Sequence, residues 1–236
     1  MENIDRTDFL GLDDLHAVFF DFDDVLVQSL DIKAQAFMTL FDGRAESLKA
    51  KILDHFISYT GRSRQSKIRH VYEFILREPL TEEGLECHCQ LFSERSLEAV
   101  IGAEEVRGSE QLLGILKQRN IEMFIVSGTP EIELQRIVEA RGVTGLFREV
   151  RGTPVEKELN IAKLLENYRL DPANCLMVGD GTVDHFAAQY NQMPFVGVVK
   201  RQNPFPSEVP VVPDLEGLGR FLVAKSRNQE IKSIGN

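Results

Sequence analysis

A short apolar run that ends abruptly in three carboxylates is the feature that most constrains the fold of this chain. Residues 16–20 (HAVFF) are almost continuously apolar, and Asp21, Asp23 and Asp24 follow them directly. A run that is apolar at successive positions, rather than at alternate ones, is typical of a strand buried on both faces. Such strands belong to parallel sheets covered by helices, so the run predicts an α/β fold.

The hydrophobic pattern divides the chain into two parts. Residues 28–106 have almost entirely helical patterns, whereas helices alternate with short apolar runs after them. These runs lie at 121–126, 147–150, 175–178 and 195–199. Strands that alternate with helices favour a parallel sheet with helices on both faces. We therefore expect a Rossmann-like α/β core formed by residues 1–27 and 107–236, with an inserted all-helical domain at 28–106, a size that suits a small lid.

Polar residues that can carry chemistry follow the predicted strands. They are Asp21 and Asp23 after the first strand, Ser127 and Gly128 after the second, Asp180 and Asp184 after the strand at 175–178, and Lys157 at the start of a helix between the last two segments. Ligands bind at the carboxyl ends of the strands in an open parallel sheet. We therefore expect these residues to surround one site.

The four acids predict a cation site. Asp21 and Asp23 are two residues apart, so on an extended chain their side chains leave the same side, and Asp180 and Asp184 are four apart, so on a helix they share a face. Carboxylates that converge without a cation repel one another and lack a partner. Mg²⁺, which takes a few carboxylates together with water and phosphate oxygens, is the natural candidate.

A cation, a hydroxyl, backbone amides and a fixed lysine charge are what phosphoryl transfer requires. The charge that develops on the phosphoryl oxygens has to be neutralised in place. An aspartate beside the metal can attack phosphorus to give an aspartyl phosphate. A second carboxyl group can protonate the leaving oxygen and then activate water.

Four motifs, in this order, resemble those of the haloacid dehalogenase superfamily of phosphohydrolases. They are HAVFFDFDDVLVQS, MFIVSGTP, VEKELNIAKLL and CLMVGDGTVDHFAA. The resemblance implies the following roles: Asp21 as the nucleophile, Asp23 as the general acid/base with its backbone carbonyl on the metal, Ser127 on a phosphoryl oxygen, Lys157 neutralising the nucleophile and the phosphate, and Asp180 and Asp184 on magnesium.

The insert resembles the helical cap of phosphoglycolate phosphatases and β-phosphoglucomutases. Such caps close over the site and select the substrate. Within the insert, TGRSRQSKIRHVYEFI resembles a cap segment of phosphoglycolate phosphatase-like members. This resemblance makes Arg62, Arg64 and Lys67 candidates for contact with an anionic substrate.

One position departs from the family pattern. The residue after Asp23 is commonly glycine in this family, and here it is Asp24. Aspartate adds a third acid beside the nucleophile and lacks the backbone freedom of glycine. Two outcomes are open at this point: a side chain that points to solvent, or one that alters metal affinity or the choice of leaving group.

Ordinary structural interpretations stay open for the same residues. Asp21 and Asp23 could form an acidic strand end, Ser127 could cap the helix after Pro130, Lys163 competes with Lys157, Asp184 could complement a helix dipole, and the three basic residues of the insert could form a solvated face.

The leading functional hypothesis is a magnesium-dependent phosphatase that acts on a small phosphorylated metabolite, of the phosphoglycolate or sugar phosphate class. A phosphomutase of the β-phosphoglucomutase type would use the same residues. A non-catalytic binding protein is the third hypothesis, because fold does not fix function. A dehalogenase is disfavoured, because those family members dispense with the metal and need no acid at the position of Asp23.

Charge and composition narrow the classes of partner that the protein can bind. The 236 residues include 37 Asp and Glu and 27 Lys and Arg, which gives a net charge of −10 and opposes binding to nucleic acid. No apolar run approaches the roughly 20 residues of a membrane span. The acidic start of the chain does not resemble a signal peptide, and three cysteines do not suggest a disulfide framework, so we expect a cytoplasmic protein. The sequence indicates no oligomeric state.

Overall fold

A parallel sheet organises the computed structural model, which describes residues 11–59 and 61–223. Six strands form one sheet in the order β3-β2-β1-β4-β5-β6, and every pairing is parallel. They are β1 (Ala17–Phe20), β2 (Glu122–Pro130), β3 (Glu149–Thr153), β4 (Cys175–Gly179), β5 (Phe195–Val198) and β6 (Val211–Val212). The structure thus confirms the predicted Rossmann-like α/β fold.

Helices cover both faces of this sheet, which explains the continuous apolar run of β1. Ala17 and Phe19 belong to a core shared with α7 (Lys157–Tyr168) and α8 (Thr182–Tyr190). Val18 and Phe20 belong to the opposite core. That core is shared with α5 (Ser109–Gln118), α6 (Glu131–Ala140) and the helical residues 215–223. Because neighbouring strand residues point to opposite faces, every position of β1 is apolar and buried.

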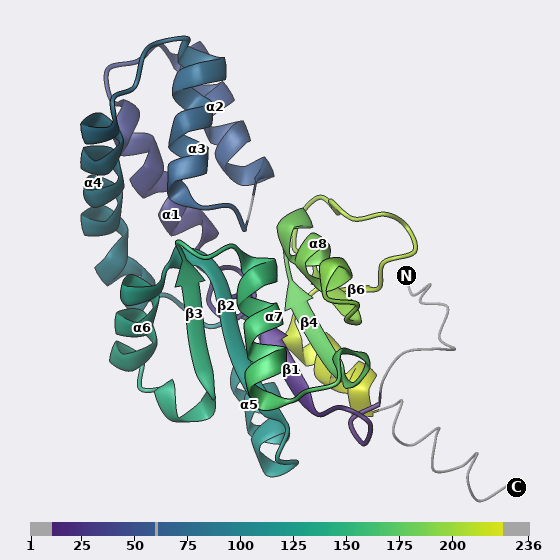
Figure 1. The fold of residues 1–236 in the computed structure, drawn as a ribbon. Helices are drawn as coiled ribbons and strands as arrows, with labels where there is room; N and C mark the ends of the chain where they lie inside the picture. Colours follow the sequence, from purple (N-terminus) through teal and green to yellow (C-terminus); the bar gives the residue numbers. More distant parts are fainter. Residues whose placement is uncertain (1–10, 60, 224–236) are drawn as a thin grey trace, which may run out of the picture.

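The segment between β1 and α5 is helical, as predicted. Its helices are α1 (Leu30–Met38), η1 (Thr39–Phe41), α2 (Glu46–Ser58), α3 (Arg64–His70), the π-helical η2 (Val71–Leu76) and α4 (Glu82–Ile101). We call this segment the helical insert. It has a hydrophobic core of its own, which includes Phe37, Phe41, Ile52, Phe56 and Ile68. The insert stands beyond the carboxyl ends of the strands (Figure 1).

The two connections of the insert lie side by side. The backbone N–H of Val106 donates to Leu26 O at 2.9 Å, and the N–H of Gln28 donates to Glu104 O at 2.8 Å. The outgoing and returning segments are therefore joined to each other beside the end of β1.

The strand order places a topological switch between β1 and β4. The chain winds from β1 toward β2 on one side and from β4 toward β5 on the other. The first residue after β1 remains tied to β4, because the N–H of Asp21 donates to Val178 O at 2.9 Å. Crevices at such switch points are where open α/β sheets bind their ligands.

Several element boundaries differ from the sequence prediction. Strand β2 continues to Pro130 with a register shift after Val126, so Ser127 and Gly128 lie on its irregular end. Helix α8 begins at Thr182, before Asp184. The proline-rich segment near the end of the described chain contains the short strand β6, which was not predicted. Among the described residues, we find no helix with the length and apolarity that crossing a membrane requires.

Candidate functional site

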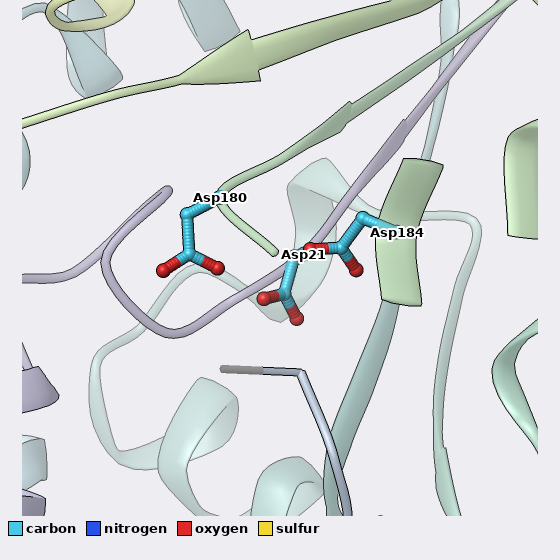
Figure 2. A group of neighbouring side chains, drawn as sticks. All are labelled: Asp21, Asp180 and Asp184. Atoms are coloured by element: carbon cyan, nitrogen blue, oxygen red, sulfur yellow. The ribbon is translucent and has the colours of Figure 1, made fainter. Parts of the chain in front are cut away.

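Three of the four predicted metal ligands come together at the topological switch. Asp21 follows β1, Asp180 follows β4, and Asp184 lies in the first turn of α8. Each offers a carboxylate oxygen, and these oxygens all lie within 4.8 Å of one another. Asp21 and Asp184 are buried, while Asp180 is partly exposed. Figure 2 shows the three side chains gathered at this end of the sheet.

The turn between β4 and α8 is built around Asp184. A Cβ atom at Gly179 would lie 2.3 Å from Asp184 Cβ, so only glycine leaves room for this carboxylate. The N–H of Gly181 donates to Asp184 Oδ2 at 2.9 Å. Asp184 therefore does cap the N-terminal turn of its helix, and its second oxygen, Oδ1, contacts the Lys157 ammonium.

Lys157 occupies the space between two of the acids. It is the first residue of α7, it is buried, and its ammonium nitrogen lies 3.0 Å from Asp21 Oδ1 and in contact with Asp184 Oδ1. Burial opposes its charge, but Asp184 and Asp21 outweigh burial and raise the pKa of Lys157. Lys163, the competing lysine, is exposed. The structure therefore places Lys157, and not Lys163, at the site.

The electrostatics of the cluster fit a divalent cation. Burial, followed by the neighbouring carboxylates, outweighs Lys157 and raises the pKa of Asp21 to about 7. Burial and the charges of Asp21 and Asp184 also raise the pKa of Asp180. Among the described residues, none donates a hydrogen bond to the buried Asp180 Oδ1. Crowded acids with an unpartnered oxygen are the donor set that a hard cation such as Mg²⁺ prefers.

Asp23 lies beside this cluster, but its side chain is engaged elsewhere. Asp23 Oδ2 accepts hydrogen bonds from Lys33 Nζ at 2.6 Å and Thr129 Oγ1 at 3.0 Å, and Asp23 Oδ1 accepts one from Ser29 Oγ at 2.6 Å. Although burial opposes ionisation, the Lys33 charge and these hydrogen bonds lower the pKa of Asp23. The predicted metal contact through its backbone carbonyl stays a prediction.

The sequence predicted Thr129 at the end of the second strand, but it assigned none of the three partners to Asp23. Ser29 and Thr129 lie within the motifs that resemble the family, so their positions beside Asp21 and Ser127 could have drawn attention to them. Lys33 carries no such signal, because it is a single lysine within α1, outside the four motifs. Only the packing of the insert against the sheet brings it to Asp23.

Ser127 and Gly128 lie where the second strand meets the insert. Ser127 is buried, and its hydroxyl oxygen accepts a hydrogen bond from the N–H of Thr129 at 3.1 Å. It does not cap α6, whose N-cap residue is Pro130, so that structural interpretation of Ser127 was wrong. A Cβ atom at Gly128 would lie 2.6 Å from Gly61 O. The insert therefore touches the core at this glycine.

Basic side chains of the insert face the acids across a cavity of about 50 Å³. Its lining includes Asp21, Asp23 and Asp180 from the core, and Lys33, Arg62, Arg64 and Lys67 from the insert. Lys67 is buried, with its ammonium 4.1 Å from the centre of the Phe56 ring. It forms no ion pair with the described residues. Burial, followed by the Lys33 charge, lowers the pKa of Lys67 to about 8.

The other two predicted substrate-binding residues differ from Lys67. Arg62 is exposed, and its guanidinium lies 5.3 Å from the centre of the Tyr59 ring. Arg64 is buried and paired with Glu133 of α6, with 2.7 Å between Nη2 and Oε1. Ser93 of α4 donates to the second oxygen of Glu133 at 2.5 Å. Arg64 thus bridges the insert and the core in this conformation. The first residue of the predicted cap segment, at position 60, lies outside the described residues.

Comparison with known proteins agrees with the fold and the motifs. A family model described as haloacid dehalogenase-like hydrolase matches residues 15–190. The fold and the carboxylate cluster thus define a hydrolase with a Rossmann-like core. The chain belongs to the haloacid dehalogenase-like hydrolase family. A search of curated proteins finds no match.

Solved structures share the fold at low sequence identity. A predicted phosphoglycolate phosphatase from Haemophilus somnus is 19% identical, with a TM-score of 0.72 over 88% of this chain and 97% of that one. A predicted phosphatase from Clostridium acetobutylicum is 18% identical, with a TM-score of 0.72 over 89% of this chain and 99% of that one. A β-phosphoglucomutase from Clostridium difficile is 17% identical, with a TM-score of 0.72 over 92% and 99%.

Proposed function

We propose that this chain is a magnesium-dependent phosphatase that hydrolyses a small phosphorylated metabolite through an aspartyl phosphate. One observation carries the proposal: a buried carboxylate, Asp21, lies 3.0 Å from the ammonium of Lys157 and within 4.8 Å of two further acids. A nucleophile, a fixed positive charge and a cation site are thereby combined at one point, which is what phosphoryl transfer requires.

Asp21, Asp180 and Asp184 would hold Mg²⁺, together with the backbone carbonyl of Asp23. When bound, the cation supplies positive charge for the phosphoryl oxygens. The protein would supply further donors to the phosphoryl group: the Ser127 hydroxyl, the N–H of Gly128 and the Lys157 ammonium. These groups neutralise charge where it develops in the transition state.

The reaction takes two steps at Asp21. A carboxylate oxygen of Asp21 attacks phosphorus, and the bond from phosphorus to the leaving oxygen breaks as that oxygen takes a proton from Asp23. Asp23 then removes a proton from water, whose oxygen attacks phosphorus and releases Asp21 and inorganic phosphate. The ion pair with Lys33 favours the ionised form of Asp23, which is the form that acts as a base in the second step. The first step needs this ion pair to loosen as substrate binds.

The insert, taken as a cap over residues 28–106, would select the substrate. The Lys67 ammonium, which forms no ion pair with the residues that the structure describes, suits an anionic group, and the cavity of about 50 Å³ is small. Since one water needs about 10–15 Å³ by this measure, the cavity holds a group of the size of a few waters. A substrate of the phosphoglycolate or sugar phosphate class exceeds this volume, so it would also extend into the neighbouring cavity of about 440 Å³, which Ser127, Gly128 and Lys157 line.

Phosphate release from a panel of esters tests the proposal. The panel contains phosphoglycolate, sugar phosphates, nucleotides and para-nitrophenyl phosphate, each with Mg²⁺ and with a chelator. We expect magnesium-dependent release by the wild-type protein, none by Asp21→Asn, and wild-type release by Asp42→Asn, whose side chain is exposed. Circular dichroism would show that both variants are folded. A fully active Asp21→Asn protein would contradict the nucleophile assignment.

The same panel separates the competing functions. A phosphomutase would convert one sugar phosphate isomer into another without releasing phosphate, which product analysis detects. A binding protein would do neither, and would only retain its ligand. Absence of phosphate release from every ester would overturn the phosphatase proposal.

A further inference from the structure

Asp24 has a backbone conformation that few residues adopt. Its φ angle is +58°, in the left-handed region. Glycine enters this region without steric cost, whereas among other residues aspartate and asparagine are the usual exceptions, because their short polar side chains bond locally. The departure from glycine is therefore compatible with the turn, and the question becomes what the added carboxylate does.

The carboxylate of Asp24 binds the first turn of the insert. Asp24 Oδ1 accepts hydrogen bonds from the backbone N–H of Ser29 at 3.0 Å and of Leu30 at 2.9 Å. These two amides begin α1. The opposite oxygen, Oδ2, lies 3.6 Å from the ammonium of Lys200, and the Asp24 side chain is only 13% exposed. Asp24 thus joins three segments: the loop after the nucleophile, α1 and the segment after β5.

Ser29 cannot supply this cap itself. It occupies the N-cap position of α1, but its side chain accepts no hydrogen bond from the helix. Its hydroxyl donates to Asp23 Oδ1 instead, at 2.6 Å. Because the first amides of a helix need acceptors, the role that a serine usually has at this position passes to Asp24.

We propose that Asp24 is a positioning residue that fixes α1 to the nucleophile loop and so places Ser29 and Lys33 against Asp23. Ser29 and Lys33 stand at the first positions of the same helix, and both donate to the carboxylate of Asp23. A shift of α1 would move both donors together. Asp24 also lines the cavity beside Asp21 and Asp180, but in this role it acts through α1. The effect on turnover rests on the proposed phosphatase function.

Three variants separate the backbone, the hydrogen bonds and the charge. Asp24→Gly keeps the left-handed turn and removes both acceptor oxygens. Asp24→Asn also tolerates the turn and keeps one acceptor oxygen, but it removes the charge. Asp31→Asn is the matched control, because it removes a carboxylate from the first turn of the same helix, where the side chain is 73% exposed and pairs with Arg201.

Hydrogen exchange of the Ser29 and Leu30 amides, followed by NMR, is the first measurement. We expect exchange in Asp24→Gly to be about tenfold faster or more, because both amides lose their acceptor. Asp24→Asn and Asp31→Asn should keep wild-type exchange. Unchanged exchange at both amides in Asp24→Gly would overturn the proposal, whatever the protein hydrolyses.

Turnover of the best ester from the panel is the second measurement. We expect kcat of Asp24→Gly to fall about 10- to 100-fold with a smaller change in KM, since misplaced groups lower the rate of the chemical step. Asp24→Asn should retain activity. If kcat of Asp24→Asn falls as far as that of Asp24→Gly, the effect is due to the charge of Asp24 and the proposal is wrong. If amide exchange in Asp24→Gly is faster but its kcat is unchanged, Asp24 has no positioning role in turnover. If the wild-type protein hydrolyses nothing, the phosphatase proposal fails, and the amide exchange still decides whether Asp24 holds α1.

Discussion

The ammonium of Lys33 lies 2.6 Å from Asp23 Oδ2 and 2.8 Å from Thr129 Oγ1. Lys33 belongs to the insert, whereas its two partners belong to the core. The side chain that orients the proposed acid/base is therefore in place only when the insert is closed over the sheet.

Removal of this lysine should impair turnover. We expect Lys33→Met to lower kcat by about 10- to 100-fold, because Asp23 loses its charged partner and keeps the two hydroxyl donors of Ser29 and Thr129. Steady-state kinetics with the best ester would measure the change. Lys49→Met is the control, because Lys49 forms a surface pair with Glu46 within α2 and is not among the residues that line the cavity. Wild-type kcat in Lys33→Met would refute this role.

Loss of Asp180 should raise the Mg²⁺ concentration that activity requires. In Asp180→Asn, one of three clustered carboxylates becomes neutral, and we expect the half-saturating Mg²⁺ concentration to rise about tenfold or more. Titration of phosphate release with Mg²⁺ measures this, and calorimetry with Mg²⁺ alone gives an independent value. An unchanged titration would count against Asp180 as a ligand.

A methyl group at Gly128 should keep the insert from closing fully. The added Cβ atom would lie 2.6 Å from Gly61 O and 3.2 Å from Arg62 O, both of them backbone atoms. We expect kcat/KM of Gly128→Ala to fall about tenfold or more, because the cap loop has to move. Gly114→Ala is the control: nothing lies within 4 Å of its added atom, and alanine within α5 should stabilise the protein by about 0.5–1 kcal/mol. Equal kcat/KM in wild type and Gly128→Ala would contradict the contact.

The pair of Arg64 and Glu133 should contribute more to stability than to binding. Their side chains are 6% and 10% exposed, and removal of one member leaves the other charge buried. We expect Arg64→Met to lower the free energy of unfolding by about 3–5 kcal/mol, measured by urea denaturation. The double variant with Glu133→Met should recover part of this loss. If Arg64 mainly binds substrate, stability will stay unchanged and KM alone will rise.

His55 should make the folded protein sensitive to mild acid. Burial, followed by the charges of His70 and Lys67, lowers the pKa of His55 from 6.5 to about 4. In the unfolded chain His55 therefore binds a proton near pH 6.5, while in the folded protein its imidazole stays neutral until about pH 4. The contribution of the neutral His55 imidazole to the free energy of unfolding is complete above pH 6.5. It is lost as the pH falls toward 4, by up to about 3 kcal/mol. Urea denaturation of the wild type and His55→Phe between these pH values measures it. Parallel pH dependences in both proteins would exclude His55 as the cause.

The main features of the fold could be predicted because they have local causes. A strand buried on both faces has to be apolar at each position, and the run before Asp21 carries that signature. The acids could be predicted for a related reason: each one directly follows a strand or opens the next helix, so topology alone brings Asp21, Asp180 and Asp184 together.

Contacts between distant segments could not be predicted in the same way. The partner of Arg64 lies 69 residues away on α6, and no spacing in the sequence connects the two. Lys33 meets Thr129 across 96 residues. The short strand β6 escaped notice because its two valines follow a proline and form no longer apolar run. These features depend on how the insert and the core pack, which a linear pattern does not record.

The two connections of the insert, which are hydrogen-bonded through Leu26 and Val106 and through Gln28 and Glu104, have an evolutionary consequence. A segment that leaves and re-enters a fold at one place can be lengthened, shortened or replaced without displacing the strands that carry the acids. The insert and the core can therefore change independently in evolution. The clustered acids are retained with the sheet, while the side chains above them, Lys33 included, change with the insert at a single pair of neighbouring junctions.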